Sequence, residues 1–247
     1  LDYNTDYCTQ LIAPKKYKIS NLTHDPTYWY CDFESDTSQK IHKPFLCCLH
    51  SENGKIKKEF RGDKCNIQLL NYLPTESIVY FHNLSYDIRM VLFYGTKDLN
   101  ITKSIIKGNK TFTMDIKIGN KKIHFKDSLP IFNCKLSQLP LMFKLHGIEK
   151  ELFPYNYYTY ERLKNNDGVI NEAGENEEPK WNEEQYKLFN SNIDKIKGCR
   201  TDENHFDMWS YASFYCHQDT SILRQSFLLF RKGFINLVFS LWISKLY

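Results

Sequence analysis

The order of apolar segments predicts strands in the first half of the chain and helices between and after them. Short runs rich in aromatic and β-branched residues, or alternating apolar and polar residues, are typical of strands. The predicted strands cover residues 28–35, 45–50, 55–60, 77–81, 101–107, 110–118 and 121–126. Gly-Asn pairs separate the last three segments and predict a β-meander.

The helical patterns are fewer and fall mostly after the strands. A short buried helix is predicted around residues 88–93, ending at Gly95, and an apolar stripe at helical spacing covers residues 136–145. Residues 161–207 are acidic and rich in asparagine, which predicts a loop region with a short helix at 183–189. A long apolar helix is expected over 208–230. This order fits an α+β or α/β domain around a mixed sheet.

Composition narrows the class of protein. The 247 residues correspond to one or two domains, and with 42% hydrophobic and 15% aromatic residues the chain can form a real core. Eight cysteines occur without a C-x-x-C pair, so a zinc ribbon is not expected. We expect an intracellular protein with reduced thiols. The sequence does not predict which compartment holds it. The longest apolar run, residues 234–243, is about half of what a bilayer requires, so no membrane partner is predicted.

Charge is distributed unevenly along the chain. Residues 1–150 carry 22 basic and 15 acidic side chains, a net charge of +7, whereas residues 151–207 carry 7 and 13, a net charge of −6. Residues 208–247 have a net charge of +3. A basic body is compatible with a phosphate-bearing partner and equally with lysines that solvate strands.

Two carboxylates lie two residues apart on the first predicted strand, in Asp32-Phe33-Glu34. Side chains at this spacing point to the same face of a strand. Two carboxylates on one buried face repel each other unless a cation lies between them. The alternative is a pair of surface acids on an edge strand.

Two further acids occur where a site can form. Asp87 follows the strand at 77–81 and begins a helix, at the carboxyl edge of the sheet, although it could instead stabilise the helix N-terminus. Tyr215 and Asp219 are four residues apart on the last predicted helix and therefore share one face. Alternatively, Tyr215 is a core residue and Asp219 a solvated one.

The order of these motifs along the chain is similar to that in a known protein family. D-x-E on a first strand, Asn83-x-x-Tyr86-Asp87 after an inner strand and Y-x-x-x-D on a late helix resemble the DEDDy-type 3′–5′ exonuclease domain of family B DNA polymerases. The stretch 81–87, Phe-His-Asn-Leu-Ser-Tyr-Asp, and the stretch 126–129, Lys-Asp-Ser-Leu, are similar to motifs of the protein-primed branch of that family. The resemblance covers about residues 26–233.

The resemblance implies a ribonuclease H-like α/β fold, a mixed sheet flanked by helices with an attached β-meander. It also implies two divalent ions, Mg²⁺ or Mn²⁺, held by Asp32, Glu34, Asp87 and Asp219. Tyr215 would orient the attacking water. A histidine subclass would need a histidine five residues before Asp219, where this chain has Phe214, and His217 lies on a different face of the helix.

The same resemblance implies a set of substrate-binding residues and partners. The residues expected to hold the frayed 3′ end are His82, Asn83, Tyr86, Lys126, Ser128 and Leu129. His82 could instead be a hydrogen-bonded core histidine, and Ser128 a helix N-cap. The expected partner is the 3′ end of single-stranded DNA or a primer-template duplex, and the protein-primed branch leaves a terminal protein open as a second partner.

Residues 1–25 are then expected to be an N-terminal segment of a parent chain, residues 26–233 the exonuclease domain with an acidic insert at 151–207, and residues 234–247 the truncated start of a link to a polymerase domain. The Asp-x-x-Ser-Leu-Tyr-Pro-like and Tyr-x-Asp-Thr-Asp-like polymerase segments are absent from the sequence, so no DNA synthesis is expected from this chain alone. The proofreading exonuclease part of a DNA-directed DNA polymerase is thus predicted. A binding module without turnover, for single strands or a terminal protein, and a free-standing exoribonuclease are the alternatives.

Overall fold

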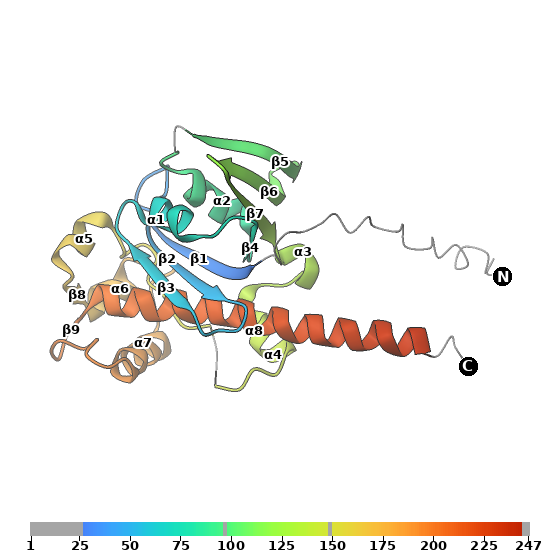
Figure 1. Ribbon diagram of the computed structural model, residues 1–247. Coiled ribbons are helices and arrows are strands. Elements are labelled where there is room, and N and C mark those ends of the chain that lie inside the picture. The colour runs from blue at the N-terminus through green and yellow to red at the C-terminus, as the bar shows by residue number, and fades with distance from the viewer. Residues whose placement is uncertain (1–26, 96–97, 148–149, 244–247) are drawn as a thin grey trace.

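A seven-stranded sheet lies at the centre of the computed structural model, which describes residues 27–95, 98–147 and 150–243 (Figure 1). The strands are β1 (Tyr28–Asp36), β2 (Lys43–Ser51), β3 (Lys57–Arg61), β4 (Ser77–Phe81), β5 (Leu99–Lys107), β6 (Lys110–Ile118) and β7 (Lys121–Asp127). Their order is β3-β2-β1-β4-β7-β6-β5. β4 pairs in parallel with β1 and β7, and the other neighbouring strands are antiparallel, so the sheet is mixed, as predicted.

Helices cover both faces of this sheet. The main helices are α1 (Cys65–Tyr72), α2 (Leu84–Leu92) and α8 (Met208–Ile243). Cys31 and Phe33 of β1 belong to the core that includes residues of α1 and α2, whereas Tyr30 packs with Phe227 of α8 on the opposite face. Because side chains alternate along a strand, the even-numbered positions of β1 face α8. Asp32 and Glu34 therefore point to the face that α8 covers.

Residues 151–207 fold against the first half of α8, so the predicted loop region is wrong. They form α5 (Tyr160–Asn165), β8 (Gly168–Val169), α6 (Ile170–Glu175), α7 (Glu183–Lys195) and β9 (His205–Phe206). Tyr157, Phe189 and Phe206 are fully buried in one cluster with Tyr211 of α8. The sequence pattern did not predict this core because its aromatic residues are separated by acidic and other polar residues. Within this region the helix predicted at 183–189 is confirmed, and it extends to Lys195 as α7.

The segment after β7 contains short helices in place of the predicted stripe at 136–145. It consists of α3 (Leu129–Phe132), the 3₁₀ turn η2 (Leu136–Gln138) and α4 (Leu139–Met142). Pro140 lies in the first turn of α4, where its missing N–H costs least, and prevents one continuous helix through this stretch. Leu139 and Phe132 pack against α8 in the third core cluster.

The remaining elements agree with the sequence pattern, with two differences. The predicted β-meander is present as β5–β7, and it is attached to the rest of the sheet by the pairing of β7 with β4. The helix α1 was not predicted, and α8 continues beyond residue 230 to Ile243. The predicted N-terminal segment 1–25 and residues 244–247 of the predicted link lie outside the described residues. Among the described helices, none has the length and hydropathy that crossing a bilayer requires.

Candidate active site

Four carboxylates converge from three elements, and three of them are buried while Asp32 is half-buried. Asp32 and Glu34 extend from β1 toward α8, and Glu34 is only 4% exposed. Asp87 lies in the first turn of α2, directly after β4, and Asp219 lies on α8; each is 3% exposed. β1 and β4 run parallel, so both strands deliver their acids to the same edge of the sheet.

The four carboxylates interact electrostatically. Burial raises the pKa of Asp32 well above its usual value, and the charge of Asp219 raises it further. Burial and the charges of Asp32 and Asp219 raise the pKa of Glu34. Burial and the charge of Asp32 do the same to the pKa of Asp87. The cluster is therefore short of positive charge, and it would ionise fully only with a cation among the carboxylates.

Tyr215 lies one helical turn before Asp219, on the same face of α8, and is 1% exposed. Its hydroxyl is 2.6 Å from the hydroxyl of Tyr155. Burial, together with the charge of Asp219, raises the pKa of Tyr215 well above that of an exposed tyrosine. The phenol therefore stays protonated and keeps a proton that it can donate.

Lys150 and Tyr155 are site residues that the sequence analysis missed. The ammonium of Lys150 forms an ion pair with Asp219 and donates a hydrogen bond to the hydroxyl of Tyr215. Both residues come from a stretch without regular secondary structure, where hydropathy gives no signal. A lysine five residues before a tyrosine is too common a pattern to single out, so only the tertiary structure identifies this pair.

The donor atoms fit a hard divalent cation. Asp32 and Glu34 offer carboxylate oxygens that lie, with the sulfur of Cys216, within 4.8 Å of one another. Oδ1 of Asp219 is buried and has no hydrogen-bond partner among the described residues, although Lys150 occupies the other oxygen. Mg²⁺ and Mn²⁺ prefer such oxygen ligands. Cys216, which was not predicted here, donates from its thiol to the carbonyl of Asp32 at 3.5 Å.

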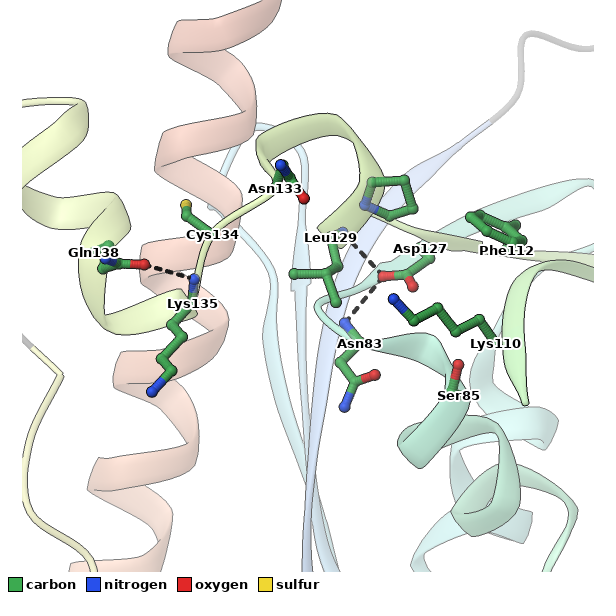
Figure 2. A pocket seen from close by; sticks show the side chains of 11 residues that line it. Asn83, Ser85, Lys110, Phe112, Asp127, Leu129, Asn133, Cys134, Lys135 and Gln138 are labelled. Carbon is green, nitrogen blue, oxygen red and sulfur yellow. Dashed lines mark hydrogen bonds between the residues drawn. The ribbon is translucent and has the colours of Figure 1, made fainter. Parts of the chain in front are cut away.

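A pocket of about 570 Å³ opens between the start of α2 and the segment after β7, and none of the four carboxylates lines it (Figure 2). Asn83 and Leu129, two of the predicted strand-binding residues, both line it. One oxygen of Asp127 accepts hydrogen bonds from the backbone N–H groups of Asn83 and Leu129, at 2.9 Å each. Lys110 and Phe112 of β6 also line the pocket. It therefore combines a cation, an aromatic ring and amide groups.

His82 and Ser128 lie next to this pocket but are not among its lining residues. Nε2 of His82 donates to the carbonyl of Cys134 at 2.9 Å, and Nδ1 lies 3.0 Å from the hydroxyl of Ser128. Burial lowers the pKa of His82, so the ring is neutral. Ser128 occupies the N-cap position of α3, but its hydroxyl makes no cap bond and lies 2.9 Å from the carbonyl of Phe81. These contacts tie β4 to the segment after β7 and give both ring nitrogens of the half-buried His82 a partner.

Tyr86 and Lys126, the last two predicted strand-binding residues, lie apart from this pocket. The hydroxyl of Tyr86 is 2.5 Å from that of Ser35 and 3.0 Å from Nδ1 of His42. Lys126 lies on β7, opposite Tyr80 of β4. Neither residue lines the pocket. The structure thus brings Asn83 and Leu129 together and leaves these two outside.

Known proteins provide three comparisons. A family model described as "DNA polymerase type B, organellar and viral" matches residues 68–244. No curated protein matches the chain in sequence. Among solved structures, Phi29 DNA polymerase complexed with single-stranded DNA is similar, with a TM-score of 0.50 and 16% identity over 85% of this chain and 32% of the polymerase. Its orthorhombic crystal form gives the same score and identity over 85% and 31%. The chain therefore spans about a third of that polymerase, and the likeness shows the fold.

Proposed function

The chain belongs to the organellar and viral family of type B DNA polymerases, and on that premise we propose that it carries a 3′–5′ exonuclease site that removes nucleotides from single-stranded DNA. The observation that carries the proposal is the convergence of half-buried Asp32 with the buried Glu34, Asp87 and Asp219 in one electrostatically interacting cluster. In a DNA polymerase, such a site would serve proofreading. A terminal protein remains a predicted second partner, from the resemblance to the protein-primed branch.

The four carboxylates would hold two divalent ions of the Mg²⁺ or Mn²⁺ class. When bound, such ions polarise a phosphate and lower the pKa of water. The pKa values of the acids support this assignment, since burial raises all four and only Asp219 has an ion-pair partner among the described residues. Two divalent cations would offset four carboxylate charges.

Tyr215 would orient the attacking water, and Lys150 would set the direction of its hydroxyl. Because the Lys150 ammonium donates to the Tyr215 oxygen, the phenolic proton is directed elsewhere, toward Asp219, toward Tyr155 or toward a water in the site. The positive charge of Lys150 would also stabilise negative charge that develops on the phosphate. Lys150 thus acts on the reaction both through Tyr215 and by its charge.

The pocket of Figure 2 would bind the nucleotides next to the 3′ end. Phe112 offers an aromatic face for a base, Lys110 a positive charge for a phosphate, and Asn83 an amide. Stacking of one base on one aromatic ring contributes about 1–3 kcal/mol. A strand held there would enter the carboxylate cluster past Asn83, which begins the helix that carries Asp87.

The test compares cleavage of a 5′-labelled single-stranded oligonucleotide in Mg²⁺ by the wild-type chain and two variants. Asp32→Asn combined with Glu34→Gln removes two charges and should abolish cleavage. Asp115→Asn removes a charge on β6, beside His124 and away from the cluster, and should cleave at the wild-type rate. Cleavage that survives in the folded double variant would overturn the proposal and leave a binding module without turnover.

A further inference from the structure

A row of side chains crosses three strands and continues past the candidate active site. Asp32 of β1 lies directly opposite Cys48 of β2, and Cys48 lies directly opposite Glu59 of β3. Directly opposed residues project from the same face of a sheet. All three therefore face α8, which adds His217 above the second half of the row.

The second half of this row forms a compact group of metal-ligating atoms. The sulfur of Cys48, a carboxylate oxygen of Glu59 and a ring nitrogen of His217 all lie within 4.8 Å of one another. Nε2 of His217 is 3.5 Å from Oε2 of Glu59. Ligands at bond lengths of about 2.0–2.3 Å around tetrahedral zinc are separated by about 3.3–3.8 Å. The bound of 4.8 Å for the three atoms exceeds that separation by about 1 Å, so small side-chain shifts would complete the geometry.

We propose that Cys48, Glu59 and His217 bind one divalent cation of the zinc class, at a site separate from the four carboxylates. Sulfur and imidazole nitrogen favour Zn²⁺ or Co²⁺ over Mg²⁺, which prefers oxygen ligands. A thiolate and a carboxylate together offset the two positive charges of the ion. Three protein ligands leave a fourth position for water.

The surroundings of the three ligands support the assignment. Nδ1 of His217 lies 2.8 Å from Nε2 of the buried His50, so Nε2 of His217 is turned toward Glu59. Arg61 forms an ion pair with Oε1 of Glu59, while Oε2 faces His217 and also accepts a hydrogen bond from the hydroxyl of Ser213. Such contacts around the ligands fix their orientation in metal sites.

Access to the site is also suitable. The side chains of His217 and Glu59 are 27% and 22% exposed, so an ion can reach the site from solvent, while Cys48 is buried beneath them. The bound ion would join α8 to β2 and β3 within one turn of Asp219.

The test is a titration of the metal-free, reduced chain with Co²⁺ in saturating Mg²⁺, which occupies oxygen-only sites. We expect one Co²⁺ per chain, a thiolate-to-cobalt charge-transfer band, the visible bands of tetrahedral cobalt, and displacement by Zn²⁺. Absence of the charge-transfer band from the folded wild-type chain would overturn the proposal.

Four variants assign the ion to this site. Cys48→Ser should lose the charge-transfer band, and His217→Gln should weaken binding by at least about 100-fold. His50→Gln should weaken binding by about 10–100-fold through the orientation of His217. Cys216→Ser is the matched control and should keep the band. Loss of the band in Cys216→Ser but not in Cys48→Ser would move the ion to the Asp32–Glu34 cluster and overturn the assignment. If Cys48→Ser does not fold, His217→Gln decides: unchanged affinity there would also overturn it.

Discussion

The two halves of the row across β1, β2 and β3 differ in the ligand atoms that they bring together. At Asp32, four carboxylates meet, with Lys150 as the balancing cation. At Cys48, a thiol, a carboxylate and an imidazole meet, and each already has a polar partner. Hard oxygen donors and mixed sulfur–nitrogen donors select different ions. Adjacent positions in one ladder can therefore form two sites of different chemistry beneath the same helix.

The largest expected effect separates these two sites. Asp219→Asn removes one carboxylate without changing the shape of the side chain. Its exonuclease rate should fall by about 10³-fold or more, equivalent to about 4 kcal/mol in activation free energy. The cobalt charge-transfer band of Cys48 should persist in the same variant. Measuring both in one preparation sharpens the comparison, and loss of the band together with the rate would show a single coupled site.

Lys150→Met should destabilise the metal-free chain, because it leaves Asp219 buried without its partner. Breaking such a pair costs about 3 kcal/mol or more, although proton uptake by Asp219 can recover part of this. Urea unfolding with and without Mg²⁺ measures this loss of folding free energy. Lys135→Met, on the exposed rim of the pocket, is the control and should leave stability unchanged. Equal stability of Lys150→Met and wild type in EDTA would contradict the role given to the ion pair.

Stability of the metal-free chain should fall as the pH rises above about 4, the ordinary value for carboxylates. The folded-state pKa values of Asp32, Glu34, Asp87 and Asp219 are raised, so the native state holds protons that the unfolded state has released. Their contribution is present below the unfolded pKa and is lost as the pH passes through the raised values. A tenfold difference in proton affinity between the two states corresponds to about 1.4 kcal/mol of stability.

Thermal or urea unfolding between acidic and neutral pH measures this decrease of stability with pH. Saturating Mg²⁺ should reduce it, and Asp32→Asn should reduce it without metal. A stability that instead rises with pH over this range in EDTA would contradict the raised pKa values. The group at Cys48 offers a contrast, because hydrogen bonding from His217 outweighs the opposing effect of burial and the pKa of Glu59 is lowered to about 2.

Phe112→Ala should have the smallest effect. Loss of one stacking ring should weaken binding of a short single-stranded oligonucleotide by about 1 kcal/mol, or about fivefold. Fluorescence anisotropy in Ca²⁺ or EDTA measures this without cleavage. Phe60→Ala lies away from the pocket and is the matched control. Equal affinity of Phe112→Ala and wild type would remove this ring from the proposed path of the strand.

Local patterns predicted the carboxylate site but not the residues that complete it. Asp32 and Glu34 could be paired because strand periodicity puts them on one face, and Tyr215 and Asp219 because helix periodicity does the same. Lys150 reaches the cluster from a segment without regular structure, so no periodicity identifies it.

The group at Cys48 illustrates why the register between strands could not be predicted from the sequence either. Its partners depend on which residue of β3 lies opposite which residue of β2, and a shift of β3 by one residue would turn Glu59 to the other face. The sequence places His217 on another face of α8 than Asp219, but it does not say what that face meets. The fold was more accessible, since every strand of the central sheet has its own local pattern, while the 151–207 region depends on dispersed aromatic residues such as Tyr157 and Phe206.

The central claim is that the carboxylate cluster is a metal-dependent exonuclease site. The most direct measurement follows a 5′-labelled single-stranded DNA oligonucleotide on a sequencing gel, with Mg²⁺, with Mn²⁺ and with EDTA. We predict a ladder of products shortened one nucleotide at a time from the 3′ end in either metal, none in EDTA, and recovery when Mg²⁺ is added back. An intact oligonucleotide in Mg²⁺ and Mn²⁺ with folded protein, or a ladder that persists in EDTA, would contradict the claim.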